Sequence, residues 1–135
     1  MNEDDKTFVG IDDMIGKTIT KIVGGIQDTE LTFYTSDGYE YKMYHEQDCC
    51  ETVYVEDISG DLNDLIGRVI VEASEVSQQN PHATESGTWT FYKLNSDRYY
   101  GGVCIRWNGE SNGYYSESVA LCRKQIISEE DENGN

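Results

Sequence analysis

The residues best suited to chemistry lie between Met43 and Asp57, in the segment MYHEQDCCETVYVED. His45 stands four residues before the adjacent pair Cys49 and Cys50, and several acids are interleaved. Imidazole, carboxylate and thiolate groups bind metals, and a thiolate beside an imidazole base is also a nucleophile. The segment is therefore a candidate metal site, a candidate catalytic site, or a polar turn between two strands.

Both chemical interpretations fit the segment poorly. Zinc sites favour cysteines separated by two residues, and the adjacent Cys49 and Cys50 cannot easily both reach one tetrahedral ion. The neighbouring acids also oppose formation of a thiolate. We therefore predict no metal, no cofactor and no catalytic residue, and a small metal-dependent or Cys/His enzyme is kept as the alternative. The residues of this segment that we predict to bind a ligand or partner are His45, Gln47, Asp48, Cys49, Cys50 and Glu51.

A second polar segment, RWNGESNGYYSES, spans residues 106–118. Aromatic residues mixed with Ser, Asn and Gly are typical of adaptable binding surfaces. A ring of Trp107, Tyr114 and Tyr115 with Arg106 would hold a base by stacking and a phosphate by charge. The residues of this segment that we predict to bind are Arg106, Trp107, Asn108, Glu110, Ser111, Asn112, Tyr114 and Tyr115.

Composition limits the classes of partner. The chain has 135 residues and a formal net charge of −16, so direct binding to nucleic acid is not expected. No apolar run is long enough to span a membrane, and the acidic N-terminus lacks the apolar core of a secretory signal. We therefore expect a cytoplasmic protein whose four cysteines are reduced, with Cys104 and Cys122 in the core.

Alternating apolar residues predict strands along most of the chain. Asp37-Gly38 predicts a hairpin turn, and Asp61 and Gly67 bracket one short helical turn. Residues 77–87 hold the only proline and are predicted to form the longest loop. The predicted strand segments are 17–25, 30–46 (two strands), 51–57, 68–77, 88–97, 101–109 and 116–126.

The chain also resembles itself. DMIGKTITKI (13–22) aligns with DLIGRVIVEA (64–73), and LTFY (31–34) aligns with WTFY (89–92). Further on, YKMYHE aligns with CIRWNG and ETVYV with ESVAL, in the same order. Four ordered matches indicate two diverged copies of one unit. In each copy a polar loop follows the third strand, and loops on a rigid sheet are the usual place for binding groups.

These patterns predict a mainly β fold of α+β type with one or two short helical turns. The expected architecture is a compact antiparallel sheet, sandwich or barrel built from two diverged repeats. Residues 1–10 are read as an acidic extension, 11–127 as one domain with repeats 11–58 and 61–127, and 128–135 as an acidic disordered tail.

Three motif blocks resemble a family of small uncharacterised domains from phage and prophage genomes. The blocks are HxQDCCE, GDLxDLIG and RWxGxSNGYYS, which here include Gly109 and Gly113, and the resemblance covers about residues 11–120. The family implies no established activity. Its phage setting implies a protein that acts on a host, in the host cytoplasm.

Two functional hypotheses follow. The first is a non-enzymatic binding protein that interferes with a host process, as counter-defence proteins do, through the two loops. It either sequesters a small polar or nucleotide-like ligand or docks an acidic face on a host protein. The second is the Cys/His or metal-dependent enzyme. A structural module is a third possibility, and the internal repeat makes a homodimer plausible.

Overall fold

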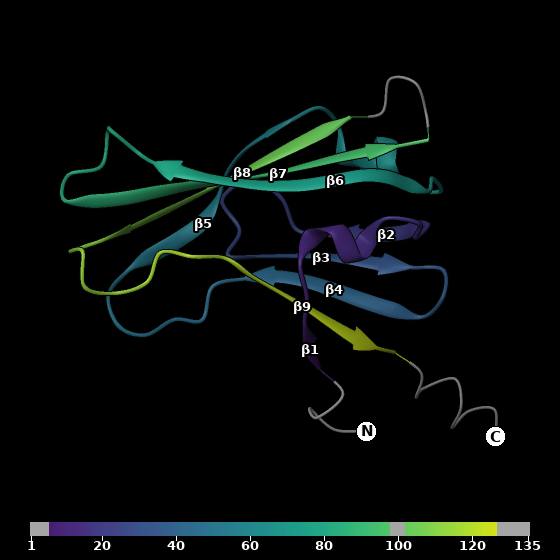
Figure 1. Cartoon of the computed structure of the whole chain (residues 1–135), viewed down its shortest axis with the longest axis horizontal. Coiled ribbons are helices and arrows are strands. Elements are labelled where there is room, and N and C mark those ends of the chain that lie inside the picture. The colour runs from purple at the N-terminus through teal and green to yellow at the C-terminus, as the bar shows by residue number, and fades with distance from the viewer. Residues whose placement is uncertain (1–5, 98–101, 127–135) are drawn as a thin grey trace.

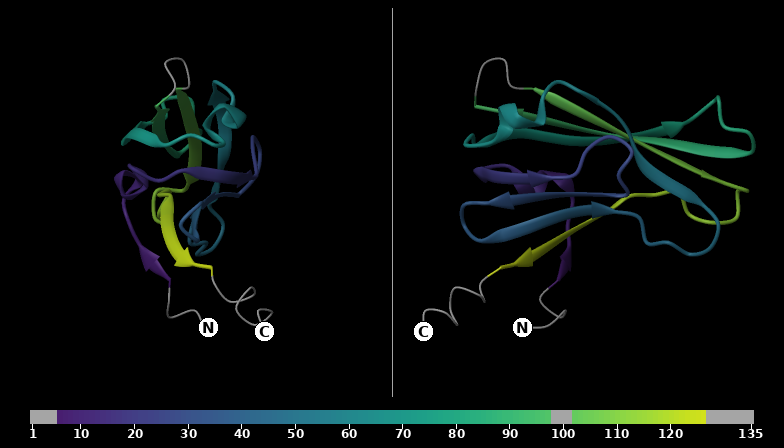
Figure 2. Two further views of the ribbon diagram at one scale, coloured as in Figure 1. Left: turned by 90° about the vertical axis from the view of Figure 1, so that its right-hand side faces the viewer. Right: turned by 180° about the vertical axis from the view of Figure 1, so that it is seen from behind.

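The computed structural model describes residues 6–97 and 102–126, which form nine strands in two antiparallel sheets (Figure 1). One sheet has the strand order β1-β9-β4-β3-β2 and the other the order β5-β8-β7-β6. The sheets lie as two layers, and neither closes into a barrel (Figure 2). The strands are β1 (Thr7–Phe8), β2 (Ile19–Val23), β3 (Glu30–Thr35), β4 (Tyr39–Tyr44), β5 (Thr52–Ser59), β6 (Ile70–Gln79), β7 (Ser86–Ser96), β8 (Val103–Ser111) and β9 (Ala120–Gln125).

The mainly β prediction is confirmed, and so are its turns. The Asp37-Gly38 dipeptide joins β3 to β4, with Gly38 at a φ of 90°, a backbone conformation that favours glycine. The helical elements in the described residues are two short 3-10 turns, η2 (Ile11–Met14) and η3 (Leu62–Leu65). Asp61 caps η3 as predicted, because its carboxylate accepts the Asn63 N–H at 3.0 Å. No helix in this part of the chain is long and apolar enough to cross a membrane.

Several boundaries differ from the prediction; the predicted strand 116–126, for example, begins only at Ala120. The predicted long loop 77–87 is much shorter, because β6 continues to Gln79 and β7 begins at Ser86. The end of the hairpin formed by β6 and β7 is polar and largely exposed, so an alternation of apolar and polar residues does not predict strands there. Thr7–Phe8, in the predicted N-terminal extension, pairs with β9 as strand β1. Residues 1–5 and the predicted tail 128–135 lie outside the described residues.

The two sheets meet at a junction where equivalent segments of the two halves pair with each other. An isolated antiparallel bridge joins Thr18 to Val69, which are equivalent in the alignment of 13–22 with 64–73. The main-chain hydrogen bonds around this bridge join equivalent residues of the two halves and so come in pairs. Ile19 N donates to Arg68 O (3.1 Å), and its equivalent Ile70 N donates to Lys17 O (2.9 Å). Gly16 N donates to Ile70 O (2.7 Å), and its equivalent Gly67 N donates to Ile19 O (2.6 Å). The junction therefore has approximate two-fold symmetry.

The halves also exchange their last strands. Strand β5, which follows β4 in the chain, pairs with β8, whereas β9 crosses back to pair with β4. Each sheet is thus completed by a strand from the other half, so the halves share one core. Both β2 and β6 carry a bulge at their first residue, opposite Thr35 and Ser96 respectively. Thr35 therefore corresponds to Ser96, and the alignment of 31–34 with 89–92 is wrong by three residues.

The core lies between the sheets and draws on both. It includes Phe33 and Met43 from one sheet and Tyr92 and Trp107 from the other, all 0–1% exposed. The free cysteines lie in strands as expected, and Cys122 is buried, but the predicted core position of Cys104 is wrong. Cys104 is half-buried, because its neighbours Val103 and Ile105 occupy the core face of the strand. This shared core provides the rigid frame from which the loops project.

Candidate functional site

Three polar segments gather at one end of the sandwich, on the left in Figure 1. They are residues 45–51 after β4, residues 80–86 from the end of β6 to the first residue of β7, and residues 110–119 from the last two residues of β8 to the start of β9. Together they are called the loop end. A surface cavity of about 280 Å³ is lined by Cys50 and Glu51, by Thr84 and Glu85, and by Glu110, Ser111, Asn112 and Tyr115. The structure therefore brings the two predicted loops together and adds a third.

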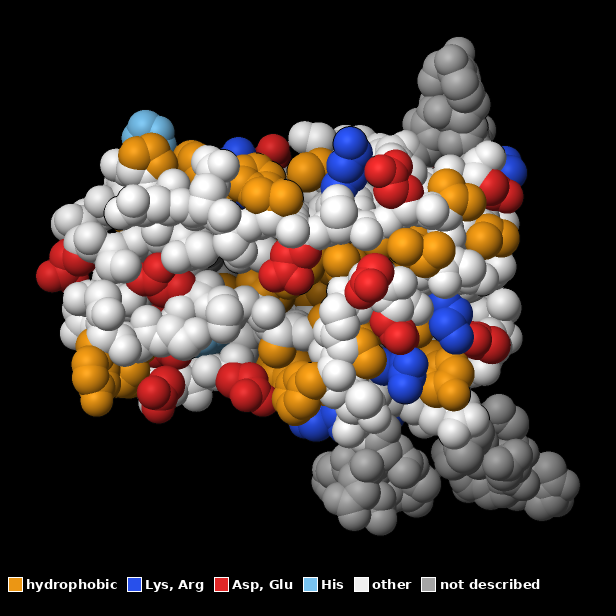
Figure 3. Space-filling model, in the orientation of Figure 1, with side chains coloured by type: hydrophobic (Ala, Val, Ile, Leu, Met, Phe, Trp, Pro, Cys, Tyr) orange, Lys and Arg blue, Asp and Glu red, His pale blue; other side chains and the backbone are white. Residues whose placement is uncertain are grey.

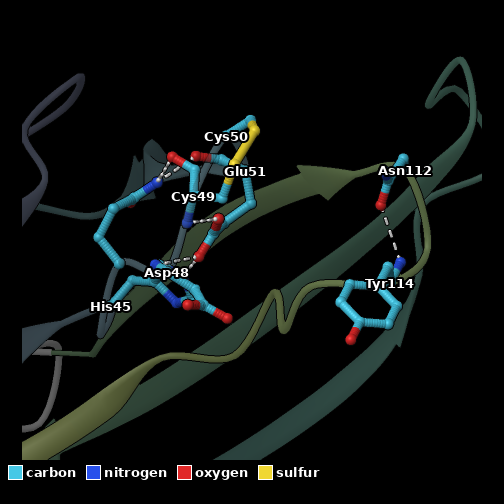
Figure 4. Close-up of a disulfide and its surroundings, with 8 residues drawn as sticks. His45, Asp48, Cys49, Cys50, Glu51, Asn112 and Tyr114 are labelled. Carbon is cyan, nitrogen blue, oxygen red and sulfur yellow. Dashed lines mark hydrogen bonds and ion pairs between the residues drawn. A yellow bond between two sulfur atoms is a disulfide. The ribbon is translucent and has the colours of Figure 1, made fainter.

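Glu51 organises the first loop from its centre (Figure 4). Its carboxylate accepts the backbone N–H groups of Asp48 and Cys49, each at 2.8 Å. His45 Nε2 lies 2.6 Å from the same carboxylate, and the Gln47 side chain donates to the Glu51 carbonyl at 2.7 Å. The Glu51 side chain is 0% exposed, so the loop is built around a buried, fully engaged carboxylate.

This environment shifts the pKa of Glu51. Burial alone would raise it, but the hydrogen bonds from His45 and from the Cys49 and Asp48 N–H groups outweigh burial and lower the pKa of Glu51 to about 2. His45 also places Nδ1 2.7 Å from the Ser118 carbonyl oxygen. The two ring nitrogens thus lie within hydrogen-bonding distance of one oxygen in each loop. His45 therefore ties the first loop to the second.

Cys49 and Cys50 form a disulfide with each other, so the expectation that all four cysteines are reduced is wrong for this pair. The two residues lie in a bend between β4 and β5, not in a strand. Strand geometry would have pointed them to opposite sides, whereas the bend brings their side chains together (Figure 4). Both residues are exposed, and Cys50 lines the shared cavity.

The second loop is organised by Glu117 in a related way. Ser111 Oγ donates to its carboxylate at 2.5 Å and Thr88 Oγ1 at 2.7 Å. Burial would raise the pKa of Glu117, but hydrogen bonds from Ser111, Thr88 and Ser86 lower it below its ordinary value. The loop turns at Asn112, whose side chain accepts the Tyr114 N–H at 2.9 Å. Sequence analysis missed Glu117, although its alignment with Glu51 in the repeat was a usable signal.

The predicted aromatic ring with Arg106 does not assemble. Trp107 is 0% exposed and packs in the core, and its indole N–H has no hydrogen-bond partner among the described residues. Arg106 points to the outer face of the sheet, where it pairs with Glu56 at 2.9 Å and lies over the Trp89 ring at 5.1 Å. Adjacent residues of a strand face opposite sides, so Arg106 and Trp107 cannot share one pocket.

Asn108 and Gly109, at the end of β8, support the loop end without forming part of its surface. Asn108 is buried and accepts a hydrogen bond from Asn80 at 2.8 Å, which fastens the 80–86 loop to β8. A Cβ on Gly109 would lie 2.6 Å from the Glu117 carbonyl oxygen, so only glycine lets the second loop cross here. These motif positions therefore support the site without presenting groups to a ligand.

Tyr114 and Tyr115 are the aromatic residues that the second loop presents. Tyr114 is 82% exposed, and its ring meets Tyr115 edge to face at 5.0 Å. Tyr115 lines the shared cavity together with Glu110, Ser111 and Asn112. Of the residues predicted in the second segment, these four and Tyr114 lie where a partner can reach them, as do the exposed residues 47–50 of the first loop.

The loop end is strongly acidic. Its three segments contain six acids and no Lys or Arg in the sequence: Glu46, Asp48, Glu51, Glu85, Glu110 and Glu117. Figure 3 shows acidic side chains on this end, whereas most Lys and Arg side chains in that view lie over the other half. Glu85 and Thr84, which sequence analysis missed, reach the cavity because the 80–86 loop folds toward β8.

The groups considered for catalysis or metal binding in the first loop are already engaged. The disulfide leaves Cys49 and Cys50 without a thiolate, and both nitrogens of His45 are engaged. Among the described residues, no three His, Cys, Asp or Glu side chains are grouped so as to hold a metal ion. The loop end is an acidic surface with one projecting aromatic residue, Tyr114.

Fold and site thus define a β-sandwich with a shared core and loops gathered at one end. The chain belongs to the family described as a domain of unknown function (DUF7448), which matches residues 12–121. No curated protein and no solved structure shows a match to the chain.

Proposed function

We propose that the protein is a non-enzymatic binding protein that docks its loop end on a basic surface of a partner protein. The observation that carries the proposal is the convergence of three loops with six acids and no Lys or Arg. Opposite charge across an interface steers association and selects partners. Tyr114, which projects from the acidic surface, supplies the kind of aromatic anchor that often dominates binding energy.

The alternative of a nucleotide-like ligand at these loops has less support. It relied on Arg106 and Trp107, which lie outside the loop-end surface, on the outer sheet face and in the core respectively. A phosphate at the loop end would meet carboxylates without a compensating Lys or Arg. Docking on a protein therefore fits the loop end better than capture of an anion.

The resemblance of the motif blocks to phage and prophage domains supports a proposal about the partner. The partner would be a host protein in the host cytoplasm, such as a defence component whose basic surface normally holds nucleic acid. An acidic protein seated on that surface would block it. Inhibition of a host process would then need no catalysis.

The test is capture of host proteins from lysate at low and high salt. We compare a loop-end variant, Glu46→Gln/Asp48→Asn/Glu85→Gln, with a control of equal net charge, Asp12→Asn/Glu72→Gln/Asp97→Asn, whose changes are also at exposed acids. We expect the wild-type protein and the control to capture the same partner at low salt, high salt to release it, and the loop-end variant to fail.

Salt-insensitive capture, or equal loss in both variants, would contradict docking through the loop end. Native mass spectrometry of the purified protein provides a second check. Excess mass that disappears on denaturation would show a carried small ligand and would favour the sequestration alternative.

A further inference from the structure

A second cavity lies on the outer face of the five-stranded sheet and differs from the loop end in charge. Its volume is about 260 Å³, and it shares no lining residue with the loop-end cavities. Three of the six lysines in the chain line it, in a protein of net charge −16. They are Lys6, Lys42 and Lys124, and they are accompanied by Glu30, Glu40 and Tyr44.

The register between β1 and β9 brings two of these lysines, Lys6 and Lys124, close together. Thr7 and Phe8 of β1 pair with Arg123 and Cys122 of β9, and continuing this register by one residue places Lys6 opposite Lys124. Like charges directly opposite each other on neighbouring strands repel. The repulsion disappears when an anion binds between the two ammonium groups.

The carboxylates in the cavity do not neutralise this pair. Glu30 lies 3.9 Å from Lys42, at the outer limit of an ion pair. Glu40 is opposite Lys124 in the register, yet neither Lys6 nor Lys124 forms an ion pair with any residue that the structure describes. The cavity therefore holds three lysines against two glutamates, and Lys6 and Lys124 are the two lysines without an ion pair to a described residue.

The aromatic surroundings indicate what else the ligand carries. The Lys6 ammonium lies 5.8 Å from the Phe8 ring centroid and 6.0 Å from that of Tyr44, so two aromatic rings lie beside it. Phe8 is 56% exposed, which leaves an apolar surface beside the charged groups. Two free ammonium groups match a dianion, and the neighbouring rings match an aromatic body.

We propose that this cavity binds a small phosphate monoester with an aromatic body, its phosphate held between Lys6 and Lys124. A phosphate monoester carries a charge near −2 at neutral pH, enough to neutralise both ammonium groups, whereas a carboxylate neutralises only one. The site is separate from the proposed docking surface and does not depend on it.

The test is a titration of the full chain with phenyl phosphate, followed by backbone amide NMR shifts. The cavity variant Lys6→Gln/Lys124→Gln is compared with Lys21→Gln/Lys93→Gln, which removes the same charge from exposed lysines elsewhere. We expect saturable shifts at Lys42, Cys122 and Lys124 in the wild-type protein. The cavity variant should bind about tenfold more weakly, and the control should stay within about twofold.

Three results would overturn the proposal. The first is the absence of saturable shifts at the cavity. The second is equal weakening in both variants, which would indicate general charge attraction alone. The third is equal affinity for benzoate, which would show that the dianion is not selected.

Discussion

The two loops that follow β4 and β8 are built around an acid at aligned positions, yet they present different groups. In the first loop, Glu51 is wholly covered and accepts backbone N–H groups as well as His45. In the second, Glu117 is half-buried and accepts side-chain hydroxyls. The first loop is also closed by a disulfide, whereas the second extends Tyr114 to solvent.

This difference suggests a division of roles within one surface. The first loop, whose backbone is hydrogen-bonded to a buried carboxylate, provides a rigid acidic surface. The second loop, held through side chains, carries the exposed aromatic residue. Because His45 bonds to Ser118, the first loop also positions the second. Variants of each loop should therefore affect different quantities, and the following predictions are ordered by their expected effect on stability.

The largest loss of stability is expected from Glu51→Gln. Glutamine has the same shape but loses the charge, and its NH₂ group must face donors that now lack an acceptor. Breaking charge-assisted hydrogen bonds in a covered site is costly, so we expect the melting temperature to fall on the order of 10 °C. Thermal unfolding followed by circular dichroism measures it. An unchanged melting temperature would show that the loop is not built around Glu51.

The pH dependence of this effect follows from the pKa of Glu51. That pKa is lowered from an ordinary 4.5 to about 2 in the folded protein. The stabilisation is therefore complete above pH 4.5 and is lost as the pH falls toward about 2. Urea unfolding at a series of pH values should show the difference between wild-type and Glu51→Gln proteins narrowing as the pH falls. A difference that stayed constant would contradict the ionic account.

Glu117→Gln is expected to have a smaller effect in the same direction. The carboxylate is half-buried, and a glutamine can still accept from the Ser111 and Thr88 hydroxyls, which can themselves rotate to accept from the amide. We expect the melting temperature to fall by about 3 °C. If Glu117→Gln were as destabilising as Glu51→Gln, the two loops would be held alike and the comparison would fail.

Reducing the disulfide should change stability even less. A cross-link between adjacent residues closes almost no chain and so restricts the unfolded state very little. Both cysteines are exposed, so packing adds little. We expect a shift of less than about 2 °C when the protein is unfolded with and without a dithiol. Alkylation of the unfolded, unreduced protein should label only Cys104 and Cys122, and four labelled cysteines would contradict the bond.

Much of the fold could be predicted from sequence because local signals agreed with it. The turn at Gly38, the cap at Asp61 and the match of 13–22 with 64–73 all correspond to features of the structure. Periodicity could not predict the polar end of the β6–β7 ribbon or the exchange of β5 and β9, because side-chain alternation does not encode which strands pair.

The site was harder to predict than the fold. Residue type placed Arg106 and Trp107 in a pocket, but strand alternation sends one to the outer face and the other into the core. Composition likewise showed the acidity without showing that three loops share it. The lysine cavity is assembled from Lys6, just before β1, and from residues of β3, β4 and β9, so no short sequence segment contains it.

The smallest effect on stability is expected from Tyr114→Ala, which should nevertheless have a large effect on binding. Tyr114 is 82% exposed, so its removal should leave the melting temperature within about 1 °C of the wild-type value. If it anchors the docked partner, capture from lysate should fall about tenfold or more. Val71→Ala, at an exposed apolar residue of β6 outside the three loop-end segments, is the control and should leave capture intact. Equal capture by Tyr114→Ala and the wild-type protein would assign recognition to the acidic surface of the first loop, and the division of roles would then be wrong.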